Sequence, residues 1–193
     1  MNPTQEKEPH AQHSVCVFCA SSNGSDPIFL EAAQALGRAI AERGWRLVYG
    51  GADVGLMGAM ADAAMAHGGS VTGVIPHSLA EREIAHRGLT ELVETGSMHE
   101  RKAEMARRAD AFLVLPGGLG TLDELCEILT WRLLGIHEKP VVLINIAGYW
   151  DAFLGLLDGA VAAGFLRAAD RRLPLVAADA EEACRKVEMA RKA

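Results

Sequence analysis

Short apolar runs alternate with longer stretches of helical periodicity along most of this chain, and this alternation limits the folds that it can adopt. Strands that are separated by helices form parallel βαβ units. The strand-like runs cover residues 15–19, 45–49, 70–75, 91–95, 111–115, 140–144 and 173–176. We therefore expect an α/β fold, a Rossmann-like doubly wound sheet of mostly parallel strands with helices on both faces.

The stretches between these runs carry helix signals. In the clearest case Asp26 supplies a cap and Pro27 a first-turn proline, apolar residues recur on one face up to Ile40, and Gly44 ends the helix. Further helices are expected at about 55–67, 98–108, 121–134 and 149–163, and from residue 179 onward. The apolar positions of 121–134 leave little of that helix polar, so we expect it to be buried, with another subunit as one covering surface.

The bulk properties suit one compact domain, because the chain has 193 residues and 50% of them are hydrophobic. We expect a disordered polar leader over 1–13 and a single α/β domain over 14–193. A net charge of −6 argues against a nucleic-acid polymer as partner. No apolar run reaches the roughly 18–20 residues that cross a bilayer, and no secretory or transit signal is visible. We therefore expect a cytoplasmic protein with no membrane partner.

Cys16 and Cys19 have the spacing of a metal or redox pair. They lie in a strand-like run, however, where residues three apart point to opposite faces. No second pair of this kind and no nearby histidine pair completes a site, so we favour buried structural cysteines. We expect neither a metal nor a cofactor.

The most informative loop follows the run at 111–115, because strand, glycine loop and helix start come in that order at Pro116–Thr121. Backbone N–H groups at a helix start have no intrahelical partner and face an anion, which the helix dipole also favours. Thr121 fits a helix cap or a phosphate ligand. Glu124 fits either the partner of Thr121 in a capping box or a carboxylate that faces the ribose of a bound nucleotide.

Two other turns follow strand-like runs at the same expected edge of the sheet. Gly50 and Gly51 follow the second run, and Ser21 and Ser22 follow the first. Gly55 and Gly58 fit close packing of a helix on a strand as well as ligand contact. The serines fit a simple turn or bonds to a phosphate or base.

The most basic stretch of the chain places Met98, Arg101, Lys102 and Met105 on one helical stripe. Charged runs are usually solvated faces, but cations on an apolar stripe need a partner. A bound phosphate, together with Glu124, is one such partner.

With these residues the chain resembles the Lonely Guy family of cytokinin-activating phosphoribohydrolases, formerly labelled lysine decarboxylase-like. The resemblance runs from residue 15 to about 164, and its specific signatures are Met-x-x-Arg-Lys at 98–102 and Pro-Gly-Gly-x-Gly-Thr-x-x-Glu at 116–124. It implies a homodimer or higher assembly and release of a free base and ribose 5-phosphate. One departure is Ala52, where many relatives have glycine; this puts base preference in doubt. We see no pyridoxal-phosphate site around the candidate lysines Lys102 and Lys139.

The resemblance implies that Arg101 and Glu124 are the catalytic pair of a nucleoside 5′-monophosphate hydrolase. The expected substrate-binding residues are Ser21, Ser22, Gly50, Gly51, Met98, Lys102, Pro116, Gly117, Gly118, Leu119, Gly120 and Thr121. The substrate is a cytokinin riboside 5′-monophosphate, AMP or both. The alternative is a nucleotide or molybdopterin carrier or sensor that breaks no glycosidic bond. A third interpretation, an interaction protein, depends on the apolar helix at 121–134 and is compatible with catalysis.

Overall fold

The computed structural model describes residues 13–80 and 85–191. Within these residues the strands form one seven-stranded sheet in the order β4-β3-β2-β1-β5-β6-β7, and every neighbouring pair is parallel. The strands are β1 (Ser14–Phe18), β2 (Arg46–Tyr49), β3 (Ser70–Pro76), β4 (Glu91–Thr95), β5 (Ala111–Val114), β6 (Val141–Ile144) and β7 (Pro174–Ala177). The expected Rossmann-like α/β fold is therefore confirmed.

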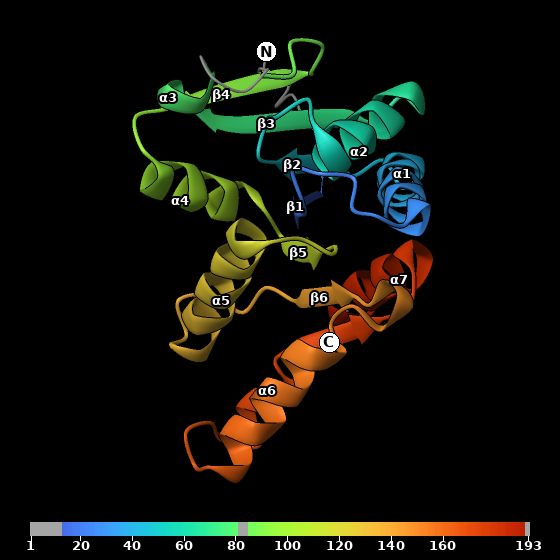
Figure 1. The fold of residues 1–193 in the computed structure, drawn as a ribbon. Helices are drawn as coiled ribbons and strands as arrows, with labels where there is room; N and C mark the ends of the chain where they lie inside the picture. The colour runs from blue at the N-terminus through green and yellow to red at the C-terminus, as the bar shows by residue number, and fades with distance from the viewer. Residues whose placement is uncertain (1–12, 81–84, 192–193) are drawn as a thin grey trace, which may run out of the picture.

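Helices cover both faces of this sheet (Figure 1). The helices α1 (Pro27–Glu42), α2 (Gly55–Ala66) and α7 (Ala180–Ala190) pack on one face. The other face carries α4 (Met98–Arg108), α5 (Leu119–Leu133) and α6 (Asp151–Ala162). The short helix α3 (His77–Ala80) follows β3, and two 3₁₀ turns lie at Ile146–Gly148 and Asp170–Arg172.

The first helix shows how local sequence sets these elements. The side chain of Asp26 accepts a hydrogen bond from the backbone N–H of Ile28 at 3.0 Å, and Pro27 occupies the first turn. Both features stabilise a helix start. The helix ends at Glu42, and Gly44 follows with φ +64°, a conformation that glycine adopts without strain.

The two faces of the sheet have separate apolar cores. Cys19 lies in the core under α1 and α2, whereas Cys16 lies in the core under α4 and α5. The prediction that these two cysteines point to opposite faces is therefore confirmed, and both are free thiols. Burial raises the pKa of the Cys16 thiol well above its ordinary value, which keeps that thiol protonated and unreactive.

Residues 1–12 of the expected leader lie outside the described residues. His13, which we assigned to that leader, already belongs to the fold. Its ring packs edge-on against Trp45 with centroids 4.8 Å apart, and its carbonyl accepts a hydrogen bond from the N–H of Arg46 at 2.7 Å. Between residues 13 and 191, leaving out 81–84, no helix combines the length and the apolar character that a bilayer crossing requires.

The strand order reverses direction at β1, since β2 lies on one side of it and β5 on the other. In open α/β sheets, ligands bind outside the carboxyl ends of the strands at such a switch point. The loops after β1 and β5 meet there, because the N–H of Ala20 donates to the carbonyl of Pro116 at 3.2 Å.

Candidate active site

A cavity of about 310 Å³ opens at this switch point. It brings together the loop after β1, the start of α5 and one side of α4. Its lining residues are Cys19, Ala20, Ser21, Met57, Leu79, Met98, Arg101, Gly118, Leu119, Gly120, Thr121, Asp123 and Glu124. Eight of our expected site residues are among them: Ser21, Met98, Arg101, Gly118, Leu119, Gly120, Thr121 and Glu124.

The start of α5 forms one wall, and it differs from our expectation. The helix begins at Leu119 with Gly118 as its N-cap, two residues before the expected start at Thr121. Thr121 therefore lies inside the first turn, where it is buried, and the capping-box interpretation of Thr121 and Glu124 is wrong. No side chain caps this helix start in the described chain. Its first N–H groups are free to face an anion.

Glycine at position 117 allows this turn to close. A Cβ on Gly117 would overlap the side chain of Thr121, so a larger residue would push the threonine out of place. The carbonyl of Gly117 also accepts a hydrogen bond from the hydroxyl of Tyr149 at 2.5 Å. Tyr149 comes just before α6, so a residue from the C-terminal part of the chain fixes the glycine loop through this hydrogen bond.

Arg101 projects from α4 into the opposite wall and is 9% exposed. Its Nε donates to the carbonyl of Val74 at 3.1 Å, and its Nη2 donates to the carbonyl of Gly50 at 3.1 Å. Its Nη1 lies 4.0 Å from Oε1 of Glu124. The guanidinium passes so close to Gly50 that a Cβ there would overlap it. Two backbone carbonyls therefore fix the cation beside the carboxylate.

Glu124 lies one turn and a half into α5, with its side chain 12% exposed. Burial raises the pKa of this carboxyl group to about 7, and the positive charge of Arg101 opposes the rise only in part. The negative charge of Asp123 raises this pKa further, and the positive charge of Lys102 lowers it. A carboxyl group with a pKa near neutrality is suited to exchange protons with a reacting molecule.

Lys102 points elsewhere. Its Nζ lies 3.0 Å from Asp123 Oδ2 and 3.1 Å from Glu127 Oε1, and the residue is not part of the cavity lining. Because Lys102 lies on an apolar stripe, its positive charge needs an anionic partner. Two carboxylates of α5 provide it. These ion pairs hold α4 against α5. Because Arg101 lies on α4 and Glu124 on α5, the same ion pairs also keep these two residues close together.

Ser22, Pro116 and Gly117 line an adjoining cavity of about 190 Å³, together with Phe29, Leu56 and Tyr149. Gly55 has φ +59°, and a Cβ there would overlap the backbone of Ser21 and Ser22. Gly55 therefore packs closely on the turn after β1 rather than on a strand, and this packing places the serine turn. The adjoining cavity shares Ala20 and Gly118 with the first one.

Gly50 and Gly51 lie outside both cavity linings and act through the backbone, the first by accepting the hydrogen bond from Arg101. Ala52 is buried in the core and pairs with Ala85 in an isolated antiparallel bridge. Its methyl group does not line either cavity, so the departure from the family pattern at this position does not narrow the site.

Sequence reasoning missed several lining residues, chiefly Met57, Leu79, Asp123 and the pair Cys19 and Ala20. Asp123 lies within the family signature and was open to detection there. Leu79 comes from α3, a helix of four residues that left no periodic signal. The two apolar side chains Met57 and Leu79 give one part of the wall an apolar character that suits a planar base.

The lysines on which a decarboxylase label would depend are both engaged in structural contacts. Lys102 forms the ion pairs with α5, and Nζ of Lys139 donates to the carbonyl of Ala106 at 2.8 Å. Neither lysine lines the cavity.

Comparison with known proteins places this geometry in a family. Residues 57–187 match the family model described as possible lysine decarboxylase. The chain is 50% identical over 174 residues to a probable cytokinin riboside 5′-monophosphate phosphoribohydrolase of Oryza sativa subsp. japonica, covering 90% of this chain and 77% of that protein. It is 49% identical over 174 residues to a cytokinin riboside 5′-monophosphate phosphoribohydrolase of Arabidopsis thaliana, covering 90% and 80%.

The same fold occurs in solved structures. The molybdenum cofactor carrier protein of Chlamydomonas reinhardtii superposes with a TM-score of 0.72 at 23% identity, over 95% of this chain and all of that one. This likeness concerns the fold alone. The extensive identity to the plant enzymes decides the family: the chain belongs to the Lonely Guy family of cytokinin riboside 5′-monophosphate phosphoribohydrolases.

Proposed function

We propose that this protein hydrolyses the N-glycosidic bond of a nucleoside 5′-monophosphate, releasing the free base and ribose 5-phosphate. The substrate is a cytokinin riboside 5′-monophosphate, AMP or both. The observation that carries the proposal is the pairing of Arg101 with Glu124 across 4.0 Å in one cavity, beside a helix start that no side chain of the described residues caps.

The phosphate binds at the start of α5, where free N–H groups and the helix dipole attract an anion. Thr121, on α5 itself, adds a hydroxyl donor, and Ser21 adds another from the loop after β1 on the facing wall. Anchoring the phosphate places the ribose further along α5 and orients the bond that is to be cleaved. The binding energy of the phosphate, which does not react, thereby helps to hold the anomeric carbon in the orientation that the reaction needs.

Glu124 acts on the ribose. As the bond from the anomeric carbon to the base nitrogen stretches, its electron pair moves to the base and positive charge grows on the sugar ring. The carboxylate stabilises this charge and accepts a proton from the attacking water, whose oxygen forms the new bond to the anomeric carbon. The proton that Glu124 takes from the water passes through solvent to the departing base nitrogen, so the carboxylate is ionised again after each turnover. Arg101 holds the carboxylate in place and contacts the sugar hydroxyls.

This role requires the ionised carboxylate. Because the pKa of Glu124 is raised to about 7, kcat/KM is expected to rise with pH through that region and to level off above it. A measured pH profile without a rising limb near neutrality would contradict the assignment of Glu124 as the base.

The direct test is to incubate the purified protein with AMP and with N6-isopentenyl-AMP and to detect free base by chromatography. Glu124→Gln is expected to bind either nucleotide nearly as well as the wild type but to turn it over about 100-fold more slowly or worse. Glu31→Gln, an exposed glutamate on α1, is the matched control and keeps full activity. Tight binding without release of base from the wild type would instead support a nucleotide or molybdopterin carrier.

We also propose that the protein acts as a cytoplasmic homodimer, with α5 and α6 at the interface. Both helices expose large apolar side chains, including Leu133 and Leu156, which are 40% and 67% exposed in the single chain. Between them lies an apolar hollow of about 230 Å³ that includes Leu129 and Phe153. Contiguous apolar surface of this kind marks interaction sites. Light scattering after size exclusion gives the assembly mass, and a monomer would contradict this proposal.

A further inference from the structure

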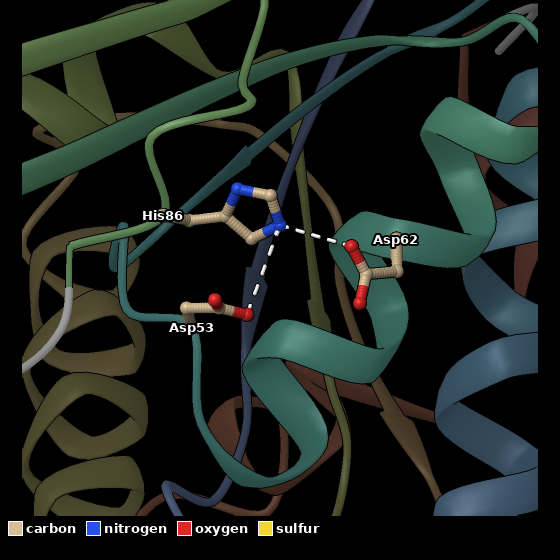
Figure 2. Close-up of side chains that lie close together, drawn as sticks. All are labelled: Asp53, Asp62 and His86. Atoms are coloured by element: carbon tan, nitrogen blue, oxygen red, sulfur yellow. Dashed lines mark hydrogen bonds and ion pairs between the residues drawn. The ribbon is translucent and has the colours of Figure 1, made fainter.

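Outside the cavity, the side chains of Asp53, Asp62 and His86 lie close together (Figure 2). His86 Nε2 lies 3.0 Å from Asp62 Oδ1 and 3.8 Å from Asp53 Oδ1. The imidazole is almost fully buried, whereas both carboxylates are largely exposed. None of the three residues lines the cavity that holds Arg101 and Glu124, whereas Asp53 and Asp62 line a separate hollow of about 580 Å³ between α1 and α2.

The hydrogen bonds around the ring determine its tautomer. The N–H of Gly88 points at Nδ1 across 3.2 Å, so Nδ1 is the acceptor and the ring proton sits on Nε2. Nε2 then donates to Asp62, with Asp53 beside it. A metal ion at Nε2 would require this proton to leave and the bond from Gly88 to break. The arrangement is therefore a hydrogen-bonded cluster rather than a metal centre. We call the hydrogen bond between His86 Nε2 and Asp62, with Asp53 beside it, the latch.

The ring of His86 ties its own segment to α2 through Asp62, and backbone bonds of the same segment hold the turn after β2. The N–H of His86 donates to the carbonyl of Gly51 at 3.0 Å, and Ala85 pairs with Ala52. The neighbouring carbonyl, that of Gly50, is the acceptor for Nη2 of Arg101. The Gly50–Gly51 turn is thus held from two sides, by the His86 segment and by the catalytic arginine.

We propose that His86, held by Asp62, is a positioning residue for the hydrolysis: it fixes the Gly50–Gly51 turn and, through the Gly50 carbonyl, the guanidinium of Arg101 beside Glu124. The inference rests on the proposed function and adds a residue to it. Without the latch the turn relaxes, Arg101 loses a fixed acceptor, and its distance from the carboxylate is no longer set. A shift of about 1 Å in a catalytic group costs up to roughly 100-fold in rate.

The charges that face Glu124 make this effect measurable. Arg101 and Lys102 on α4 lower the pKa of Glu124, whereas Asp123 and Glu127 on α5 raise it. If Arg101 moves away from Glu124, its positive charge no longer lowers the pKa of the carboxyl group, while the other charges stay in place. The limb of the pH profile that reports Glu124 then moves to higher pH.

The experiment compares His86→Ala, His86→Gln and Asp62→Ala with the wild type, using AMP or the N6-isopentenyl nucleotide, whichever the wild type cleaves. His86→Ala is expected to lower kcat about 10-fold with little change in KM, because the phosphate site on α5 is untouched, and to move the rising limb of kcat/KM upward by roughly half a pH unit or more. Asp62→Ala is expected to move the rising limb of kcat/KM to higher pH as well. His86→Gln, whose amide keeps a donor toward Asp62, restores most of the rate.

The matched control is His77→Ala in the same connection between β3 and β4. His77 is paired with Glu94 at 2.6 Å, is 67% exposed in its side chain and lies outside the latch. It is expected to leave both kcat and the limb unchanged. A His86→Ala enzyme with full activity, or one whose loss leaves the limb at the wild-type pH, would overturn the inference. A wild type that releases no base from either nucleotide would overturn the proposed function instead.

Discussion

Replacing Glu124 with glutamine removes a buried carboxyl group whose ionisation the fold opposes. Desolvation raises the pKa of this group from an ordinary value of 4.5 to about 7. Each unit of such a shift corresponds to about 1.4 kcal/mol of difference between folded and unfolded chains. The ionised carboxylate therefore costs the folded protein about 3 kcal/mol.

The sign of this cost fixes its pH window. Below about pH 4.5 the group is protonated in both states, and glutamine is nearly neutral in its effect. Between about 4.5 and 7 only the unfolded chain ionises, so the wild-type free energy of unfolding falls as pH rises. Above about 7 both states are ionised and the full cost persists. The advantage of Glu124→Gln should therefore grow across this window and then stay constant.

Urea unfolding of wild type and Glu124→Gln at several pH values between 5 and 8 measures this advantage. We expect the variant to gain about 2–3 kcal/mol relative to wild type over that range, or roughly 5–10 °C in Tm near pH 8. Glu31→Gln on α1 controls for the substitution itself. If the two unfolding free energies stay parallel from pH 5 to 8, the carboxylate is not held against its preference and the reasoning is refuted.

Other substitutions test the rest of the site. Gly50→Ala should lower kcat about 10-fold or more in steady-state assays, because the added Cβ displaces the catalytic guanidinium; unchanged kcat would contradict the packing. Tyr149→Phe removes the bond to Gly117 and should raise KM for the nucleotide by about 3- to 10-fold while altering kcat less. Lys102→Met should move the rising limb of kcat/KM to higher pH, since this cation lowers the pKa of Glu124; a raised KM with an unmoved limb would indicate direct phosphate contact.

Much of the fold could be predicted because its signals are local. Strands buried on both faces read as short apolar runs, and the amphipathic helix α1 carries its own cap. The sequence predicts the start of α5 two residues late, because Gly120 in its first turn is a poor helix former; the later turns bury Leu125 and Ile128. Four-residue α3 has no periodicity to detect.

The site was harder to predict in its contacts than in its residues. The motifs indicated Arg101 and Glu124, but their partners come from distant parts of the chain. The acceptors for Arg101 are backbone carbonyls at Gly50 and Val74, which leave no mark on side-chain identity. The sequence predicts Lys102 as a substrate-binding residue but does not reveal its ion pairs with Asp123 and Glu127, because charge alone does not tell which anions lie nearest.

The order of the strands also has a consequence for how the chain acquires activity during synthesis. β1 pairs with β2 on one edge and, on the other edge, with β5, which lies about a hundred residues later in the sequence. Arg101 precedes β5 and Glu124 follows it, so the reactive pair comes together only after that late strand has docked. A nascent chain that ends before α5 therefore has five of the seven strands but lacks Glu124. Contacts between segments as distant in sequence as β1 and β5 form slowly.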